Sequence, residues 1–211
     1  MNFKNLFDNY LKNVPTLGHV LQKHISNYHI DHLAHCSLNY YDIIKYYKSR
    51  HFILQKDEHL FKNINVKAIW LKNTNDVIPR IFVSQYIGSL PDDLSINSKK
   101  EYEDIYNHSQ YLAWTLIHGN AINHIALTHD NIERLFNNIR KDDKLTLATE
   151  LQYSQDQKLI QFSLEADKIK YTFKNGDVDF LPGYFIEFIQ RIDNRDGFEV
   201  SNASKIFDST K

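Results

Sequence analysis

The chain repeats one order of secondary-structure elements, and this order restricts its fold more than any other feature. In the first half, strand patterns at 32–38, 51–55, 66–72 and 80–87 accompany a helical pattern at 40–50. In the second half, strand patterns at 123–128, 149–154, 158–165, 168–173 and 184–191 accompany a helical pattern at 131–140. These assignments follow the period of the apolar residues and the flanking turn formers. The repetition predicts an α+β fold built from tandem βαβββ modules around a cleft, although no repeat is visible residue by residue.

The length of 211 residues suits one domain or two small fused modules. We expect a single domain over 1–211, with these parts: N-terminal helices at 1–29, a first module at 30–90, a linker and helix at 91–120, and a second module with a C-terminal tail at 121–211. Within it, helices are expected at 2–13 and 16–27, around Tyr102–Trp114, and briefly in the tail.

The composition limits the classes of binding partner and the cellular location that we expect. The net charge of −1 gives no overall field that favours nucleic acid or an anionic membrane, so neither partner is expected. The longest apolar runs are too short to span a bilayer, and the N-terminus has no apolar stretch of a signal peptide, so we expect the cytoplasm. The single cysteine, Cys36, excludes an intramolecular disulfide. The oligomeric state is not predicted.

Three metal-ligand side chains occupy matching places in the two modules. His32 and His124 lie on the opening strands, and Glu187 lies on the closing strand of the second module, where Gln85 is its counterpart in the first. Two imidazoles and one carboxylate form the facial triad of non-haem Fe(II) enzymes, which leaves positions for substrate and O2. The amide of Gln85 is a poor ligand, so we expect it near the metal or in contact with substrate.

Each of these residues could also have an ordinary structural role that involves no metal. A single histidine on a strand is more often structural or exposed than a metal ligand. Glu187 is less ordinary, because an inward carboxylate between apolar neighbours is costly unless it is paired or bound to metal. The equivalent positions of the two histidines strengthen the metal hypothesis beyond what any one residue supports.

Several short blocks resemble the DUF1338 family, whose characterised activity is the 2-oxoadipate dioxygenase/decarboxylase. They are YHIDHLA, IPRIFVSQY, HGNAINHIALT, LPGYFIEFIQR and DGFEVSNASKIFDST, in the family's order from residue 28 onward. The resemblance implies a fold related to the vicinal-oxygen-chelate proteins, with Fe(II) held by His32, His124 and Glu187. It also implies a small-molecule 2-oxo acid and O2 as substrates, with 2-oxoadipate converted to 2-hydroxyglutarate and CO2.

One position departs from the family pattern. Where the family has an arginine that holds a substrate carboxylate, four residues after the first histidine, this chain has Cys36. A thiol cannot replace the bidentate contact of a guanidinium. Either another cation such as Arg80 or Arg191 takes over, or the substrate is not a dicarboxylic 2-oxo acid. Gln152 faces the same side of a central strand as Ser154 and is a further candidate for substrate contact.

Two alternatives remain open at this point. The same fold and metal could serve an isomerase or lyase, in which the metal polarises a carbonyl and O2 is not used. A non-catalytic relative would keep the cleft only to bind a small molecule.

Overall fold

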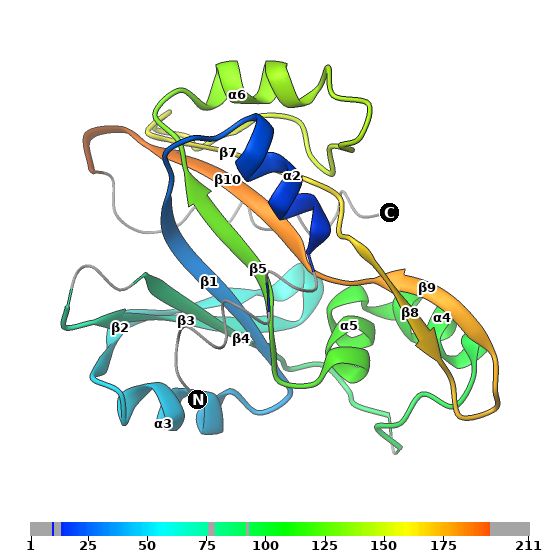
Figure 1. Cartoon of the computed structure of the whole chain (residues 1–211). Coiled ribbons are helices and arrows are strands. Elements are labelled where there is room, and N and C mark those ends of the chain that lie inside the picture. The colour runs from blue at the N-terminus through cyan, green and yellow to red at the C-terminus, as the bar shows by residue number, and fades with distance from the viewer. Residues whose placement is uncertain (1–9, 11–13, 76–78, 92, 195–211) are drawn as a thin grey trace. The chain divides into compact units, whose positions relative to one another are not determined.

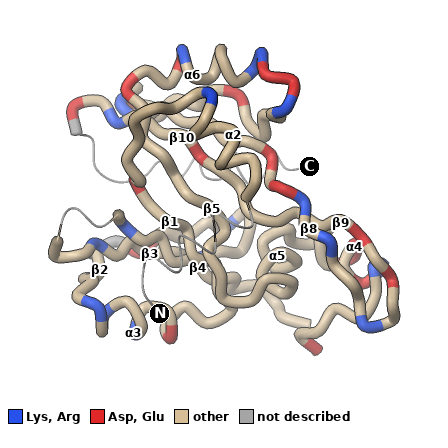
Figure 2. The backbone as a smooth tube through the Cα atoms, viewed as in Figure 1, with Lys and Arg blue, Asp and Glu red and all other residues tan. Residues whose placement is uncertain are grey.

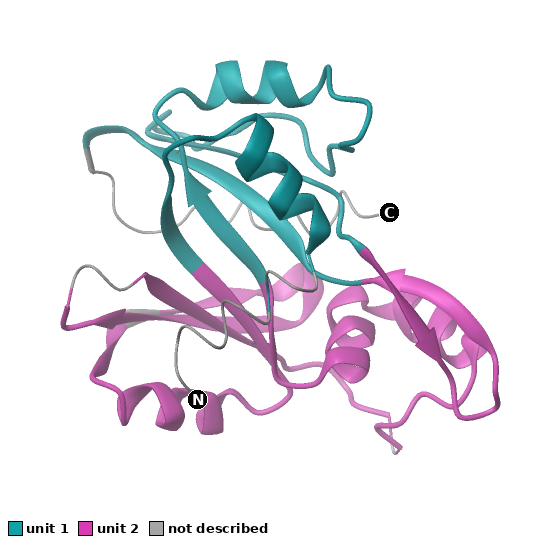
Figure 3. Ribbon diagram, in the orientation of Figure 1, with its two compact units in different colours: residues 1–32, 124–167, 183–211 teal, residues 33–123, 168–182 magenta. Residues whose placement is uncertain are grey.

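The computed structural model describes residues 10, 14–75, 79–91 and 93–194. The helices predicted at 2–13, apart from Tyr10, and in the C-terminal tail lie outside these residues, as does the block DGFEVSNASKIFDST. The chain divides into two compact units (Figure 3): unit 1 comprises residues 1–32, 124–167 and 183–211, and unit 2 comprises 33–123 and 168–182. Each is described by itself.

The strands of unit 1 follow the order β1-β5-β10-β7-β6. Unit 1 holds residues 29–32 of β1 (His29–Ser37) and 124–128 of β5 (Ala121–Thr128). It also holds β6 (Gln152–Tyr153), β7 (Leu159–Ser163) and β10 (Phe185–Arg191). Strand β10 is parallel to β5, with Phe185 beside His124, and antiparallel to β7, with Glu187 beside Ser163. Because side chains alternate between the faces of a strand, this register decides which side chains share a face.

One face of the unit 1 sheet is apolar and carries helix α6 (Ile132–Ile139), seen beside β7 and β10 in Figure 1. The Phe136 ring lies 5.2 Å from that of Phe162, which lies 4.8 Å from that of Phe188. Asn131 caps the helix by accepting a hydrogen bond from the backbone N–H of Arg134. The opposite face carries Glu187, one residue before Phe188.

Helix α2 (Pro15–Lys23) begins with proline, which suits the first turn because its missing N–H would have no partner there. It buries Leu17 and Val20. Thr16 Oγ1 donates a hydrogen bond to Asp167 Oδ1 at 2.5 Å. Tyr10 connects two strands, since its hydroxyl donates to the carbonyl of Phe185 and accepts the N–H of Ile125.

Unit 2 contains the first βαβββ order. Residues 33–37 of β1 are followed by α3 (Tyr40–Lys48), β2 (Phe52–Phe61), a 3-10 turn (Lys62–Ile64), β3 (Val66–Asn73) and β4 (Arg80–Tyr86), with strand order β2-β3-β4-β1. Asn39 caps α3 by accepting from the N–H of Tyr41. The pairing of β2 with β3 shifts register between Leu54 and Glu58, which marks a bulge.

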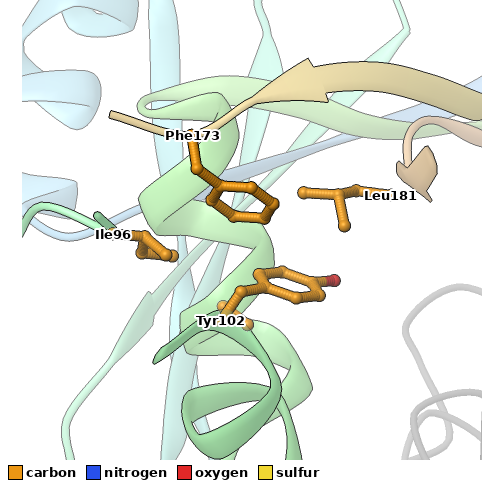
Figure 4. Packing of buried hydrophobic residues seen from close by; sticks show 5 residues of the cluster. Ile96, Tyr102, Phe173 and Leu181 are labelled. Atoms are coloured by element: carbon orange, nitrogen blue, oxygen red, sulfur yellow. The ribbon is translucent and has the colours of Figure 1, made fainter. Parts of the chain in front are cut away.

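The rest of unit 2 is a pair of helices, α4 (Lys99–His108) and α5 (Gln110–His118), packed on the hairpin of β8 (Lys168–Thr172) and β9 (Val178–Pro182). Ile96, Tyr102, Phe173 and Leu181 form the buried cluster between them, as Figure 4 shows. Acidic and basic residues are interspersed along α4 and the hairpin (Figure 2), where Lys99 Nζ lies 3.0 Å from Asp179 Oδ2.

These elements confirm the α+β class and most of the predicted elements. Four details differ. The strand expected at 51–55 continues to Phe61, as β2. The predicted helix around Tyr102–Trp114 is two helices, because Ser109 adopts an extended backbone (φ −156°, ψ 109°) and caps α5. The strand expected at 149–154 has only two paired residues, Gln152–Tyr153. The sequence pattern does not predict the strand β9, because VDFLP lacks regular alternation and ends in proline.

Candidate metal centre

Three strands of unit 1 bring His32, His124 and Glu187 together. The Glu187 Oε2 atom lies 3.4 Å from His32 Nε2 and 3.3 Å from His124 Nε2. The three ligand atoms all lie within 4.8 Å of one another. Nitrogen and oxygen ligands bind such metals at about 2.1 Å, so two bonds meeting near a right angle or slightly wider separate the ligand atoms by roughly 3.0–3.4 Å. The observed spacings therefore suit a metal ion among the three atoms.

Burial makes the arrangement hard to explain without a cation. His32 and Glu187 are each 1% exposed and His124 is 8% exposed. The second carboxylate oxygen, Glu187 Oε1, is buried and finds no hydrogen-bond partner within the described part of the chain. A buried carboxylate is costly unless it is paired or coordinates a metal. Two imidazole nitrogens and a carboxylate are a donor set that divalent metals accept.

A neighbouring ion pair fixes the orientation of the first histidine. His32 Nδ1 lies 2.8 Å from Asp31 Oδ1, and Arg191 donates from Nε to Asp31 Oδ2 at 2.7 Å and from Nη2 to Asp31 Oδ1 at 2.9 Å. With its Nδ1 proton held by Asp31, neutral His32 turns the lone pair of Nε2 toward Glu187. Lone pair and carboxylate repel each other unless a proton or a metal ion lies between them, and carboxylate–histidine pairs of this kind are common around metals.

The pKa values of Glu187, His32 and His124 are set by burial and by the contacts among these side chains and Asp31. Burial raises the pKa of Glu187, but hydrogen bonds with His124 and His32 outweigh it and lower that pKa to about 2. Burial lowers the pKa of His32, but Asp31 and Glu187 outweigh burial and leave that pKa raised. For His124, burial dominates over the contact with Glu187 and its pKa is lowered. The site thus holds an ionised carboxylate and at least one imidazole that favours the neutral, metal-binding form.

The predicted substrate residues fall in both units. In unit 1, Gln152 is partly buried and its Oε1 finds no partner among the described residues, whereas Arg191 is held by Asp31. The geometry therefore gives Arg191 a role in positioning His32, and direct contact with substrate stays a prediction.

The other three lie in unit 2. Gln85 Oε1 accepts the N–H of Tyr40 at 3.2 Å and so caps α3. The Arg80 guanidinium lies 5.3 Å from the centre of the Trp70 ring. Cys36 is buried, its Sγ accepts from Ser84 Oγ at 3.7 Å, and burial raises its pKa to about 12. These contacts give each side chain a structural role, and their roles toward a substrate stay predictions.

Sequence reasoning missed Asp31, Gln161 and Ser163. Asp31 precedes the first histidine directly, and strict alternation places adjacent residues on opposite faces, so the pattern predicts no contact between the two side chains. An acid beside a candidate ligand in the run YHIDHLAH was the available signal. Gln161 and Ser163 lie in the predicted strand KLIQFSLE, where alternation places both on one face, and two polar residues on one face are equally typical of an exposed strand.

A second group of metal-ligand side chains involves His19, His24 and Asp142 in unit 1. Both histidine Nε2 atoms contact the same oxygen, Asp142 Oδ2, at 2.9 and 2.7 Å, and Lys23 Nζ also lies 2.8 Å from it. An ammonium already neutralises this carboxylate, so the group is an ion-pair cluster that ties α2 to the segment after α6.

The helices within the described residues are too short or too polar to cross a bilayer.

Comparison with known proteins shows which family this chain resembles. The family model described as 2-oxoadipate dioxygenase/decarboxylase matches residues 80–193. The chloroplastic 2-oxoadipate dioxygenase/decarboxylase of Arabidopsis thaliana is 33% identical over 153 residues, which are 61% of this chain and 41% of that protein. The match thus spans less than half the length of this curated relative.

Solved structures agree with this match. The hydroxyglutarate synthase of Oryza sativa, in complex with 2-oxoadipate, has a TM-score of 0.83 and 25% identity, covering 98% of this chain and 90% of that chain. A protein of Ralstonia eutropha named as a glyoxalase superfamily member has a TM-score of 0.76 and 18% identity, covering 92% of this chain and 83% of that chain, which supports the fold alone.

The family model covers more than half of the chain and includes His124 and Glu187, and the family suggested by the sequence blocks is confirmed. The chain belongs to the 2-oxoadipate dioxygenase/decarboxylase family.

Proposed function

We propose that this protein is an Fe(II)-dependent dioxygenase and decarboxylase of a 2-oxo acid. The observation that carries the proposal is the buried cluster of two histidines and one glutamate, with ligand atoms 3.3–3.4 Å apart. Three protein ligands of this type leave three open positions on iron, which suit a bidentate 2-oxo acid and O2. Family membership and the 2-oxoadipate bound to the rice relative support the substrate class.

The proposed reaction balances with O2 as the only oxidant. One 2-oxo acid and one O2 give one CO2 and one hydroxy acid that is a carbon shorter, as in the conversion of 2-oxoadipate to 2-hydroxyglutarate. When bound, Fe(II) supplies the activation of O2 and the binding of the 2-oxo acid. The protein supplies the rest through its own side chains.

Those side chains hold and enclose the centre. His32, His124 and Glu187 bind the metal, and Asp31 keeps the Nδ1 proton on His32 so that the lone pair of Nε2 can coordinate. The Phe185 ring stacks on His124, with centroids 4.4 Å apart, and restrains that imidazole. Near exclusion from solvent lowers the local dielectric and strengthens each of these interactions.

For the fold, the proposal goes beyond the α+β class and names its modules. We propose tandem βαβββ modules at 30–90 and 121–211 within a single domain, which the order β1–α3–β2–β3–β4 and the order β5–α6–β6–β7–β10, interrupted by the β8–β9 hairpin, support. His32 and His124 lie on the opening strand of each. The cytoplasm remains the proposed location.

The direct test is oxygen consumption by protein reconstituted with Fe(II) under anaerobic conditions and then given 2-oxoadipate or other 2-oxo acids. We expect O2 uptake and CO2 release in equal amounts, and loss of both by a factor of at least 10³ in Glu187→Gln and His124→Ala. Glu165→Gln, an exposed acid of the same unit, is the matched control and retains activity.

Two outcomes would contradict the proposal. Stoichiometric metal without O2 uptake for any 2-oxo acid would favour the isomerase or lyase alternative. Failure to retain metal would favour a non-catalytic relative.

A further inference from the structure

Two polar side chains of β7 are buried without hydrogen-bond partners. Gln161 and Ser163 are each 1% exposed. Both amide atoms of Gln161 and the hydroxyl of Ser163 lack a partner in the part of the chain that the structure describes. Burying one such group without compensation is already costly, and natural proteins seldom leave several together without a function.

The strand register places these side chains beside the metal-binding carboxylate. Ser163 pairs with Glu187, and Gln161 pairs with Ile189 on one side and with Gln152 on the other. Directly paired residues point to the same face of a sheet, so the polar side chains share the face of Glu187. The Phe162 and Phe188 rings occupy the opposite, apolar face.

The polar groups form a line that leads away from the metal-binding side chains. Ser163 comes first, Gln161 follows two residues along β7, and Gln152 lies on the next strand. From the spacing of strands and residues, the Cα atoms of Glu187 and Gln161 are roughly 8 Å apart, a distance that an acid of a few carbons spans. Gln152 Oε1 is also buried without a partner among the described residues.

The chemistry of this line favours an uncharged ligand group. A primary amide and a hydroxyl each donate and accept hydrogen bonds. A carboxylate only accepts, so it would leave the Oε1 atoms of Gln161 and Gln152 unpaired. Arg191 shares the face but is held by Asp31 in a two-point contact. A carboxamide can donate to both of these acceptors and also accept from the donors, and a hydroxyl can accept from the donors and donate to one of the two acceptors.

We propose that Ser163, Gln161 and Gln152 form a neutral hydrogen-bonding subsite that binds the far end of the 2-oxo acid, and that this end carries a hydroxyl or carboxamide group. The inference rests on the proposed function for the identity of the chelating end. It changes the expected substrate from a dicarboxylic 2-oxo acid to one with an uncharged polar tail.

The test compares four six-carbon 2-oxo acids that differ only in the group attached to C5, which is a hydroxymethyl, a carboxamide, a carboxylate or a methyl group. With the Fe(II)-loaded full chain, we expect the hydroxyl and carboxamide acids to have kcat/KM values at least tenfold above those of the other two. A site built to hydrogen-bond a polar group rejects the analogue that lacks it by large factors.

Gln161→Leu is the decisive variant, since leucine keeps much of the volume and removes both hydrogen-bonding atoms. We expect it to raise KM at least tenfold for the hydroxyl and carboxamide acids and to leave the values for the methyl-ended acid within twofold. Removing an unpaired buried amide should also leave the thermal midpoint unchanged or higher. Gln155→Leu, at an exposed position of the same unit, is the matched control.

A binding measurement separates this inference from the proposed function. Calorimetry of the four acids with Zn(II)-loaded protein reports affinity without oxidation. If Gln161→Leu weakens binding of the hydroxyl and carboxamide acids but no acid is oxidised by the iron protein, the function fails and the subsite stands. If oxidation proceeds but the wild type prefers the carboxylate, or Gln161→Leu affects all four acids equally, the subsite is overturned and the function stands.

Discussion

At the scale of single residues, Asp31 is the side chain that orients His32 in the candidate metal centre. Although burial opposes ionisation, hydrogen bonds from Arg191 and His32 hold the pKa of Asp31 well below its ordinary range. It is therefore a fixed negative charge that orients His32 through Nδ1. Partners of this kind fix the tautomer and ring orientation of a metal-binding histidine and raise its basicity as a ligand.

Replacing Asp31 by asparagine should weaken metal binding by about 10–100-fold. Asparagine keeps the shape but loses the charge, and its amide can turn its N–H groups toward His32 and favour the wrong tautomer. Competition between the protein and a chelator for Zn(II) measures the change. Asp143→Asn, an exposed acid of unit 1, should bind metal as the wild type does. Affinity within twofold of wild type in Asp31→Asn would show that His32 needs no such partner.

His35 sets a pH dependence of stability that does not involve the metal. It is 7% exposed in unit 2, and its Nδ1 lies 3.2 Å from the hydroxyl of Tyr47. Burial, opposed only weakly by the backbone of Asn120, lowers its pKa from 6.5 to about 4. The unfolded chain therefore binds a proton at a higher pH than the folded protein does. The stabilisation is fully present above pH 6.5 and is lost progressively as the pH falls toward 4.

The expected loss from His35 is on the order of 3 kcal/mol between these limits. In His35→Gln, urea unfolding should show a flatter pH dependence between about 6.5 and 4.5 than in the wild type. His29→Gln, at an exposed position, should follow the wild-type curve. Parallel curves for His35→Gln and wild type would mean that the buried imidazole accepts a proton without cost.

At the scale of elements, the period of the apolar residues and the positions of turn-forming residues predicted most strands and helices. They did not predict the points at which these elements are interrupted. Glu187 and the two histidines could be placed because β5 and β10 are regular, so alternation gives the correct face. β9 could not be predicted, because Val178 and Phe180 are exposed on the hairpin and provide no buried stripe. Asp31 escaped prediction because its side chain turns back to its neighbour, which alternation alone does not describe.

Ser109 shows why the helix after the linker is divided. Its N–H ends α4 by donating to Ile105 O at 2.7 Å, and its Oγ starts α5 by accepting from the N–H of Leu112 at 3.1 Å. A serine with an extended backbone in this position stops one helix and caps the next. The apolar residues continue on both sides with a helical period, so periodicity indicated one helix.

Ser109→Ala should cost about 1 kcal/mol, because the first turn of α5 loses its side-chain acceptor. For a chain of this size the thermal midpoint should fall by about 2–4 °C. Ser109→Asp keeps an acceptor and should remain close to wild type. A calorimetric scan of the metal-free protein measures both, and equal midpoints for Ser109→Ala and wild type would show that the cap contributes little.

At the scale of the whole molecule, the candidate metal centre joins segments that are far apart in the chain. Its three residues come from 1–32, 124–167 and 183–211, which together make unit 1. A metal that binds all three stabilises only conformations in which these segments are folded together. The free energy of metal binding would therefore add to the folding stability of unit 1.

Divalent metal at about 100 times its dissociation constant should stabilise the folded protein by about 2.7 kcal/mol. We expect amide hydrogen exchange to slow in β10 and in residues 124–128 of β5, which carry or flank the ligands. Strands β2 and β3 of unit 2 should change less, because they contribute no ligand and local openings there do not release the metal. Glu187→Gln should lose the response in every strand. Equal slowing in β2, β3 and β10 would contradict the prediction, because it would mean that both units open only in a single cooperative event that the metal controls.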